Sequence, residues 1–154
     1  MDEQLNFNYQ QEIERLQSFF GFDFVALALV ESAEMRFAQK WKYVTGNRGT
    51  RYRRITLQTG KGVAGHVFKS GKPFFVHDVD VELDSMDLFN YPLIVAEDLK
   101  SFGAIPLYKY NRVHGVLLAA YREEKRMTTK EFSGFINHIG LRFGPYYNKE
   151  MVKQ

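Results

Sequence analysis

The glycine-rich segment GKGVAG at residues 60–65 has the clearest spacing for ligand chemistry in this chain. It matches the pattern GxGxxG, which in dinucleotide-binding domains joins a strand to a helix and holds a pyrophosphate. Those domains are built from parallel strands and crossover helices, whereas here two antiparallel-looking strands precede the motif and a hairpin follows it. No Gly-Lys-Ser/Thr sequence closes the segment as in a Walker loop. The motif therefore does not predict a nucleotide site.

The residues inside this motif allow a different chemistry. Val63 and Ala64 fall in the first turn of the predicted helix, where backbone N–H groups have no partner within the helix. Together with the helix dipole, such groups can bind an anion without a catalytic side chain. We interpret the glycines themselves as permitting a tight turn and close helix packing rather than direct ligand contact.

Trp41, the one tryptophan of the chain, is a second candidate for anion binding. Its indole N–H can only donate a hydrogen bond, which suits an anion. Alternation over residues 36–44 predicts a strand that turns Trp41 inward and its lysines outward. Phe37, Gln39 and Tyr43 would share the inner face. On residue type alone, a simple core role for Trp41 is the stronger interpretation.

Other residue types that do chemistry are absent or unfavourably spaced. The chain has no cysteine, which excludes disulfides, thiol nucleophiles and thiolate metal sites. Its four histidines show no metal-ligand spacing, and the acidic run at residues 78–87 lacks the glycine of an EF-hand loop. Nothing supports a catalytic carboxylate pair. We therefore expect a binding protein, not an enzyme, with no metal and no cofactor.

The composition indicates a single globular domain. Hydrophobic residues make up 45% of the 154 residues, and aromatic residues 16%, which is too apolar for a disordered chain. A net charge of +3 is too small to indicate a nucleic-acid binder, so the basic residues between 40 and 54 are interpreted as a solvated rim. The polar start of the chain is not a signal peptide, and no apolar run could span a membrane. We expect a cytoplasmic protein.

The elements that would position these residues form one α+β domain over residues 1–154. Helices are predicted at residues 2–20 and 128–148, with a short helix after the glycine motif that stops near residue 71. Strands are predicted at residues 24–30, 36–44, 54–58, 73–77, 101–108 and 114–121, the last two forming a hairpin. This order predicts a central, mostly antiparallel sheet flanked by the N- and C-terminal helices.

Much of the chain resembles a GAF domain. The segment LQTGKGVAGHVFKSGKP at residues 57–73 has that family's Gly-x-Gly-hydrophobic-Ala-Gly helix followed by Gly-x-Pro. AIPL at residues 104–107 and GVLL at 115–118 are similar to its closing hairpin. The resemblance implies a buried pocket for a small ligand.

Shorter matches resemble a narrower group, the NreA nitrate receptors of firmicute bacteria. They are WKYVTGN at residues 41–47, RY at 51–52, LQTGKG at 57–62, VAEDL at 95–99 and SFGAIPL at 101–107. The resemblance implies that nitrate is bound and that a sensor histidine kinase similar to NreB, in a two-component system of nitrate respiration, is regulated. The implied hydrogen-bond donors are Trp41, Val63, Ala64 and Leu93, and the implied pocket walls are Tyr91, Pro92 and Phe24.

Three alternatives remain beside the nitrate receptor. The first is a GAF domain that senses another small anion or metabolite. The second is an enzyme of the methionine-sulfoxide reductase type, whose chemistry needs cysteines that this chain lacks. The third is a homodimerisation module that pairs through the apolar stripes of the terminal helices. For the receptor, we also expect the segment at residues 97–100 to contact the kinase, so that a charge reversal at Glu97 or Lys100 would disturb kinase control.

Overall fold

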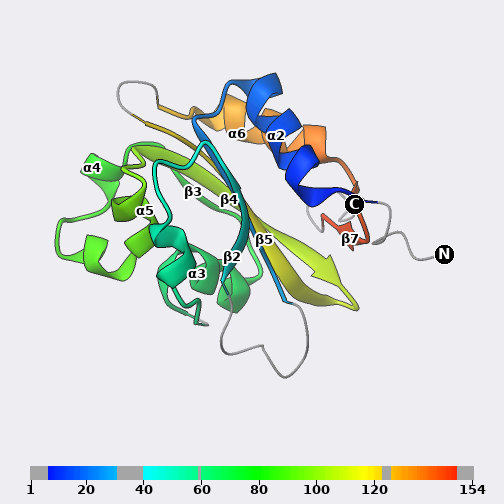
Figure 1. Ribbon diagram of the computed structural model, residues 1–154, viewed down its shortest axis with the longest axis horizontal. Helices are drawn as coiled ribbons and strands as arrows, with labels where there is room; N and C mark the ends of the chain where they lie inside the picture. The colour runs from blue at the N-terminus through cyan, green and yellow to red at the C-terminus, as the bar shows by residue number, and fades with distance from the viewer. Residues whose placement is uncertain (1–6, 31–39, 59, 123–125, 149–154) are drawn as a thin grey trace.

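The protein is described by a computed structural model, which covers residues 7–30, 40–58, 60–122 and 126–148 (Figure 1). Its described strands form one antiparallel sheet in the order β2-β1-β5-β4-β7-β6, with β3 also paired to β4. The strands are β1 (Phe24–Leu29), β2 (Trp41–Thr45), β3 (Phe74–Val76), β4 (Ser101–Lys109), β5 (Arg112–Tyr121), β6 (Arg142–Phe143) and β7 (Tyr146–Tyr147). The α+β class and the antiparallel sheet are as predicted.

Helices cover both faces of this sheet. The α-helices are α2 (Tyr9–Phe20), α3 (Gly62–Ser70), α4 (Val79–Glu82), α5 (Pro92–Ala96) and α6 (Thr129–Ile139), and the 3-10 helices are η2 (Arg51–Arg54) and η3 (Asp87–Asn90). Figure 1 shows α2 and α6 together on one face, and α3, α4 and α5 on the other. The molecule is therefore a three-layer sandwich.

The middle of the sheet is the best-predicted part of the fold. All six residues of β1 are buried, as expected for an apolar strand with neighbours on both edges and helices on both faces. Strands β4 and β5 form the predicted hairpin, closed by Tyr110 and Asn111 with φ of 54° and 65°. Two such residues form the two-residue turn that suits the twist of antiparallel strands.

The terminal helices bury their apolar stripes within the chain. Ile13 and Leu16 of α2, with Phe135 and Ile139 of α6, belong to one core cluster against the sheet. Burying such side chains stabilises the fold by roughly 1.5–3 kcal/mol each. These stripes therefore pack within the chain itself, and pairing of two copies through the terminal helices stays a prediction.

Both terminal helices are shorter than predicted. Helix α2 begins at Tyr9, where the side chain of Asn8 accepts a hydrogen bond from Gln11 N, so residues 7 and 8 precede it; residues 2–6 lie outside the described residues. The capping box of Thr128 starts α6 as predicted, but the helix ends at Ile139 because Gly140 takes φ 68°. The predicted extension to residue 148 is wrong, since it contains β6 and β7.

Two strand predictions also need correction. Residues 54–58 do not form a strand: η2 ends at Arg54, and Gln58 makes an isolated bridge to Lys61. Strand β2 begins at Trp41, and residues 36–39 of the predicted strand, with Phe37 and Gln39, lie outside the described residues. Among the described residues, no helix has the length and apolar character needed to cross a lipid bilayer.

Trp41 and Tyr43 lie on opposite faces of the sheet, not on one face as predicted. Trp41 pairs with Ala28 and Tyr43 with the adjacent Leu27, so β2 carries one extra residue at this point. Such a bulge reverses the alternation of side chains. Trp41 therefore packs in the core on the α3 side, whereas Tyr43 packs on the side of α2.

Candidate ligand-binding site

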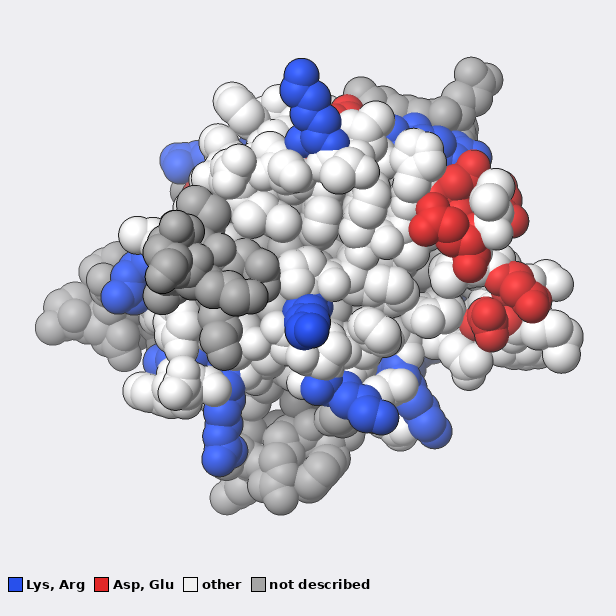
Figure 2. All heavy atoms as spheres, turned by 180° about the vertical axis from the view of Figure 1, so that it is seen from behind, with Lys and Arg blue, Asp and Glu red and all other residues white. Residues whose placement is uncertain are grey.

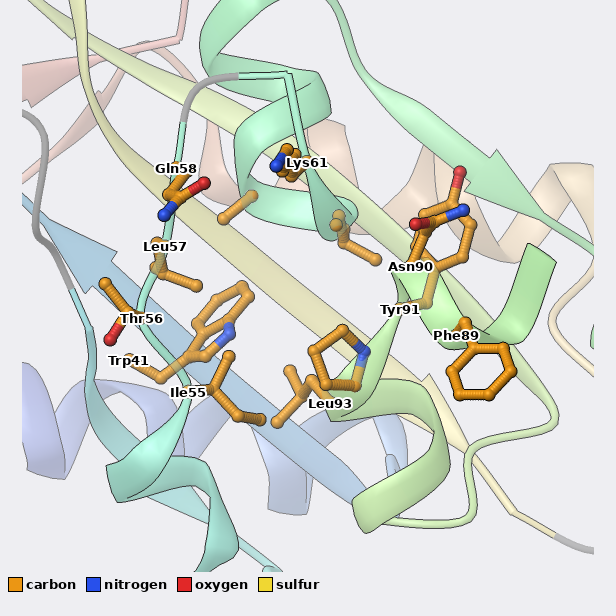
Figure 3. Close-up of a pocket in the computed structure, with 14 residues that line it drawn as sticks. Trp41, Ile55, Thr56, Leu57, Gln58, Lys61, Phe89, Asn90, Tyr91 and Leu93 are labelled. Atoms are coloured by element: carbon orange, nitrogen blue, oxygen red, sulfur yellow. The ribbon is translucent and has the colours of Figure 1, made fainter.

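A partly enclosed cavity of about 240 Å3 lies between β2, the segment 55–58, the start of α3 and the η3–α5 segment (Figure 3). Six of the seven residues named from the sequence line it: Trp41, Val63, Ala64, Tyr91, Pro92 and Leu93. The seventh, Phe24, does not. It is fully buried in the same core, with the Arg122 guanidinium 5.7 Å from its ring centre.

The glycines of the GKGVAG motif shape the wall that carries Val63 and Ala64. Gly60 takes φ 85° and its N–H donates to Gly65 O at 2.8 Å, which closes the loop before α3. A Cβ added to Gly65 would lie 2.0 Å from Gln58 O. The glycines therefore serve a tight turn and close packing, as interpreted from the sequence.

Three residues that line the cavity carry backbone N–H groups with no partner among the described residues. No side chain caps α3 at Lys61, and the N–H groups of Val63 and Ala64 donate to no described residue. Leu93 lies in the first turn of α5, directly after Pro92, and its N–H is equally unpaired among the described residues.

Trp41 supplies a donor from the opposite wall. Its side chain is buried, and its indole nitrogen lies on the ring edge turned toward Leu93 (Figure 3). It makes no hydrogen bond within the part of the chain that the structure describes. Four residues that line the cavity thus carry uncharged N–H groups with no partner among the described residues, and such donors can accommodate an acceptor such as a small anion.

The charge of the cavity also favours an anion over a cation. Of the described residues that line it, Lys61 alone is charged, and its side chain is exposed at the rim. Burial, and to a lesser degree the Asp87 carboxylate, raise the pKa of the Tyr91 phenol. Tyr91 therefore stays a neutral wall at physiological pH.

Eight lining residues were not proposed as site residues from the sequence: Ile55, Thr56, Leu57, Gln58, Lys61, Gly62, Phe89 and Asn90. Residues 55–58 were predicted as a strand, which would have paired within the sheet rather than bordered a cavity. Phe89 and Asn90 belong to the irregular acidic stretch, which has no periodicity from which a site could be inferred.

The segment after α5 differs from the expected contact surface. Glu97 is fully buried and forms an ion pair with Arg122, and Leu99 is buried as well. Lys100 is partly exposed and pairs with Asp98 at 3.3 Å. Glu97 is therefore too buried to contact a kinase directly, while the expected kinase contact of the segment at residues 97–100 stays a prediction.

Acidic side chains gather elsewhere without forming a metal site. In Figure 2 they lie at the right side, which corresponds to the left side of Figure 1, where α4 is found, because the two views differ by 180°. Helix α4 contains Asp80 and Glu82. Arg126 and Lys100 approach Asp80 there at 3.9 Å. Among the described residues, no group of three or more His, Asp or Glu residues could hold a metal ion.

The chain belongs to the GAF domain family, whose profile matches residues 10–137. This agrees with an antiparallel sheet between two helical layers and a cavity beside the start of α3. The family resemblance seen in the sequence is thereby confirmed.

Within that family the chain is similar to NreA. A solved structure of Staphylococcus aureus NreA, mutated in its nitrate-binding site, is 34% identical with a TM-score of 0.74, over 79% of this chain and 88% of that one. A hypothetical protein from S. aureus is 35% identical with a TM-score of 0.72, over 77% and 95% of the two chains.

More distant structures share the fold alone. Free methionine-R-sulfoxide reductase from Neisseria meningitidis is 19% identical with a TM-score of 0.65, over 84% of this chain and 70% of that one. No curated protein sequence is significantly similar to the chain.

Proposed function

We propose that this protein is a receptor that binds nitrate in the cavity beside α3 and performs no chemistry on it. The observation that carries the proposal is that four lining residues, Trp41, Val63, Ala64 and Leu93, carry N–H groups with no partner among the described residues. No described lining residue carries a carboxylate. Tyr91 and Pro92 would form its walls, and Phe24 would support it from the core behind.

The size and polarity of the cavity suit this ligand. Nitrate is a planar, weakly hydrated monoanion whose three oxygens only accept hydrogen bonds. Neutral donors can hold it without a full charge partner, and the remaining walls are mostly apolar. At about 240 Å3 the cavity is smaller than the roughly 300–1,000 Å3 of pockets for drug-sized ligands.

The similarity to NreA supports the biological role. In this proposal the receptor acts in the cytoplasm on a sensor histidine kinase similar to NreB, and the empty protein restrains kinase autophosphorylation. Nitrate relieves that restraint, because its free energy of binding differs between the kinase-bound and the released receptor. A thiol-dependent reductase activity does not fit, because the chain has no cysteine.

Calorimetric titration with nitrate, nitrite, chloride and sulfate tests the ligand. Wild-type protein should release heat with nitrate, and Trp41→Phe, which keeps an aromatic ring but loses the N–H, should weaken binding about tenfold or more. Tyr110→Phe, at an exposed hairpin position far from the cavity, serves as the matched control. Because Trp41 is the single tryptophan, its fluorescence reports on the same site. Saturating heat with another anion alone would favour the alternative GAF sensor.

A further inference from the structure

A second hollow lies next to the cavity, between η2, η3 and α5. This groove of about 360 Å3 has an apolar floor and two basic residues at one side. Its lining residues are Arg51, Arg54, Ile55, Leu88, Phe89, Pro92, Val95 and Ala96.

The apolar floor of the groove is unusually exposed. Phe89 exposes 86% of its surface and Val95 exposes 53%, although both are large apolar side chains. Exposed apolar side chains grouped in one hollow are typical of a protein-binding site rather than of scattered surface positions.

The basic side of the groove has no acidic partner among the residues that the structure describes. Arg51 and Arg54 are exposed, and neither forms an ion pair with any residue that the structure describes. Arg48, a few residues earlier, is by contrast paired with Asp98. Guanidinium groups at the edge of an apolar surface can bind carboxylates in a bidentate manner.

The groove and the anion cavity share walls. Ile55, Phe89 and Pro92 line both hollows. The residue after Pro92, Leu93, carries one of the proposed nitrate donors. A shift of the η3–α5 segment on anion binding would therefore change the shape of the groove.

We propose that this groove docks an acidic amphipathic segment of the sensor kinase, with apolar side chains on Phe89 and Val95 and carboxylates on Arg51 and Arg54. The proposal rests on the proposed function, because it names the surface through which the nitrate receptor meets its kinase. The shared walls would couple the two sites, and thermodynamic linkage then requires that the segment and nitrate change each other's affinity by the same factor.

Four variants distinguish the role of the groove from that of the cavity. Val95→Asp and Arg54→Glu alter residues that line the groove but not the cavity. Leu141→Asp is the control for Val95→Asp, because Leu141 is also apolar, is 56% exposed and lies beyond α6. Arg53→Glu is the control for Arg54→Glu, because Arg53 lies on the same 3-10 helix but outside the groove.

The experiment measures binding of each variant to the purified, full-length NreB-like kinase, together with nitrate calorimetry. The two groove variants should bind the kinase at least about tenfold more weakly, while their nitrate affinity and that of the controls stay within about twofold of wild type. Kinase binding by Val95→Asp and Arg54→Glu equal to wild type would overturn the docking surface alone. A wild-type protein that binds no nitrate or no kinase would instead overturn the proposed function.

Discussion

Glu97 Oε1 lies 2.6 Å from Nη2 of Arg122, and both side chains are buried where the residue after α5 meets the residue after β5. The same guanidinium donates to the backbone oxygens of Glu97, Gly46 and Asp23 at 2.7, 2.9 and 3.3 Å. One side chain from the end of β5 therefore joins the chain after α5, the turn after β2 and the residue before β1. This network fixes the cavity segment Pro92–Ala96 to the ends of strands β1, β2 and β5.

Breaking this ion pair should destabilise the fold strongly. Glu97→Gln leaves the buried Arg122 charge unpaired, so we expect a loss of about 3–5 kcal/mol in the free energy of unfolding. Asp98→Asn removes the exposed pairs with Arg48 and Lys100 and should cost about 0–1 kcal/mol. Denaturant titration of both variants measures their free energies of unfolding. Equal losses of stability in the two variants would contradict the special role of the buried ion pair.

Gly65 should tolerate no side chain. In Gly65→Ala the new Cβ would meet Gln58 O at 2.0 Å, so α3 and the cavity wall must separate. We expect a loss of about 1–3 kcal/mol and weaker ligand binding. Gly134→Ala is the matched control, because a Cβ there meets nothing within 4 Å on an α-helix and should stabilise by about 0.4–1 kcal/mol. A Gly65→Ala variant that unfolds at the same temperature as wild type would refute the close-packing role of Gly65.

The sequence was informative where one local rule decides the structure. The glycine motif predicted the start of α3 and its free N–H groups, because a tight turn into a helix leaves the first donors unpaired. The bulge in β2 was not predictable, since alternation alone does not reveal an extra residue. It places Trp41 at the cavity and Tyr43 on the other face.

Long-range contacts explain most of what the sequence did not reveal. Glu97 looks like a surface charge in its local sequence, and its partner Arg122 lies 25 residues later. Phe89 was not selected because nothing around it is periodic, yet it borders both hollows. The end of α6 was missed because an apolar residue, Phe143, continued the helical spacing beyond Gly140.

Lys61 should contribute modestly to anion affinity. Its ammonium lies on an exposed rim, where solvent and salt screen its attraction for an anion in the cavity. We expect Lys61→Gln to weaken nitrate binding by less than about fivefold, and less so at high ionic strength. Lys72→Gln removes the same charge away from the cavity and should have no effect. Calorimetry at two salt concentrations measures the nitrate affinity of both variants. If Lys61→Gln lost as much affinity as Trp41→Phe, neutral donors would not be the main contacts.

Tyr121 should make the fold sensitive to alkaline pH. Burial, followed by the nearby Glu131 carboxylate, raises the pKa of its phenol from 10.0 to about 12. The folded protein keeps this proton where the unfolded chain has lost it, so the stabilisation is fully present below pH 10 and is lost as the pH rises toward 12. Tyr121→Phe cannot titrate and should lose less stability than wild type between these two values. Thermal unfolding of both proteins from pH 9 to pH 12 checks this, and parallel curves would show that other groups carry the alkaline response.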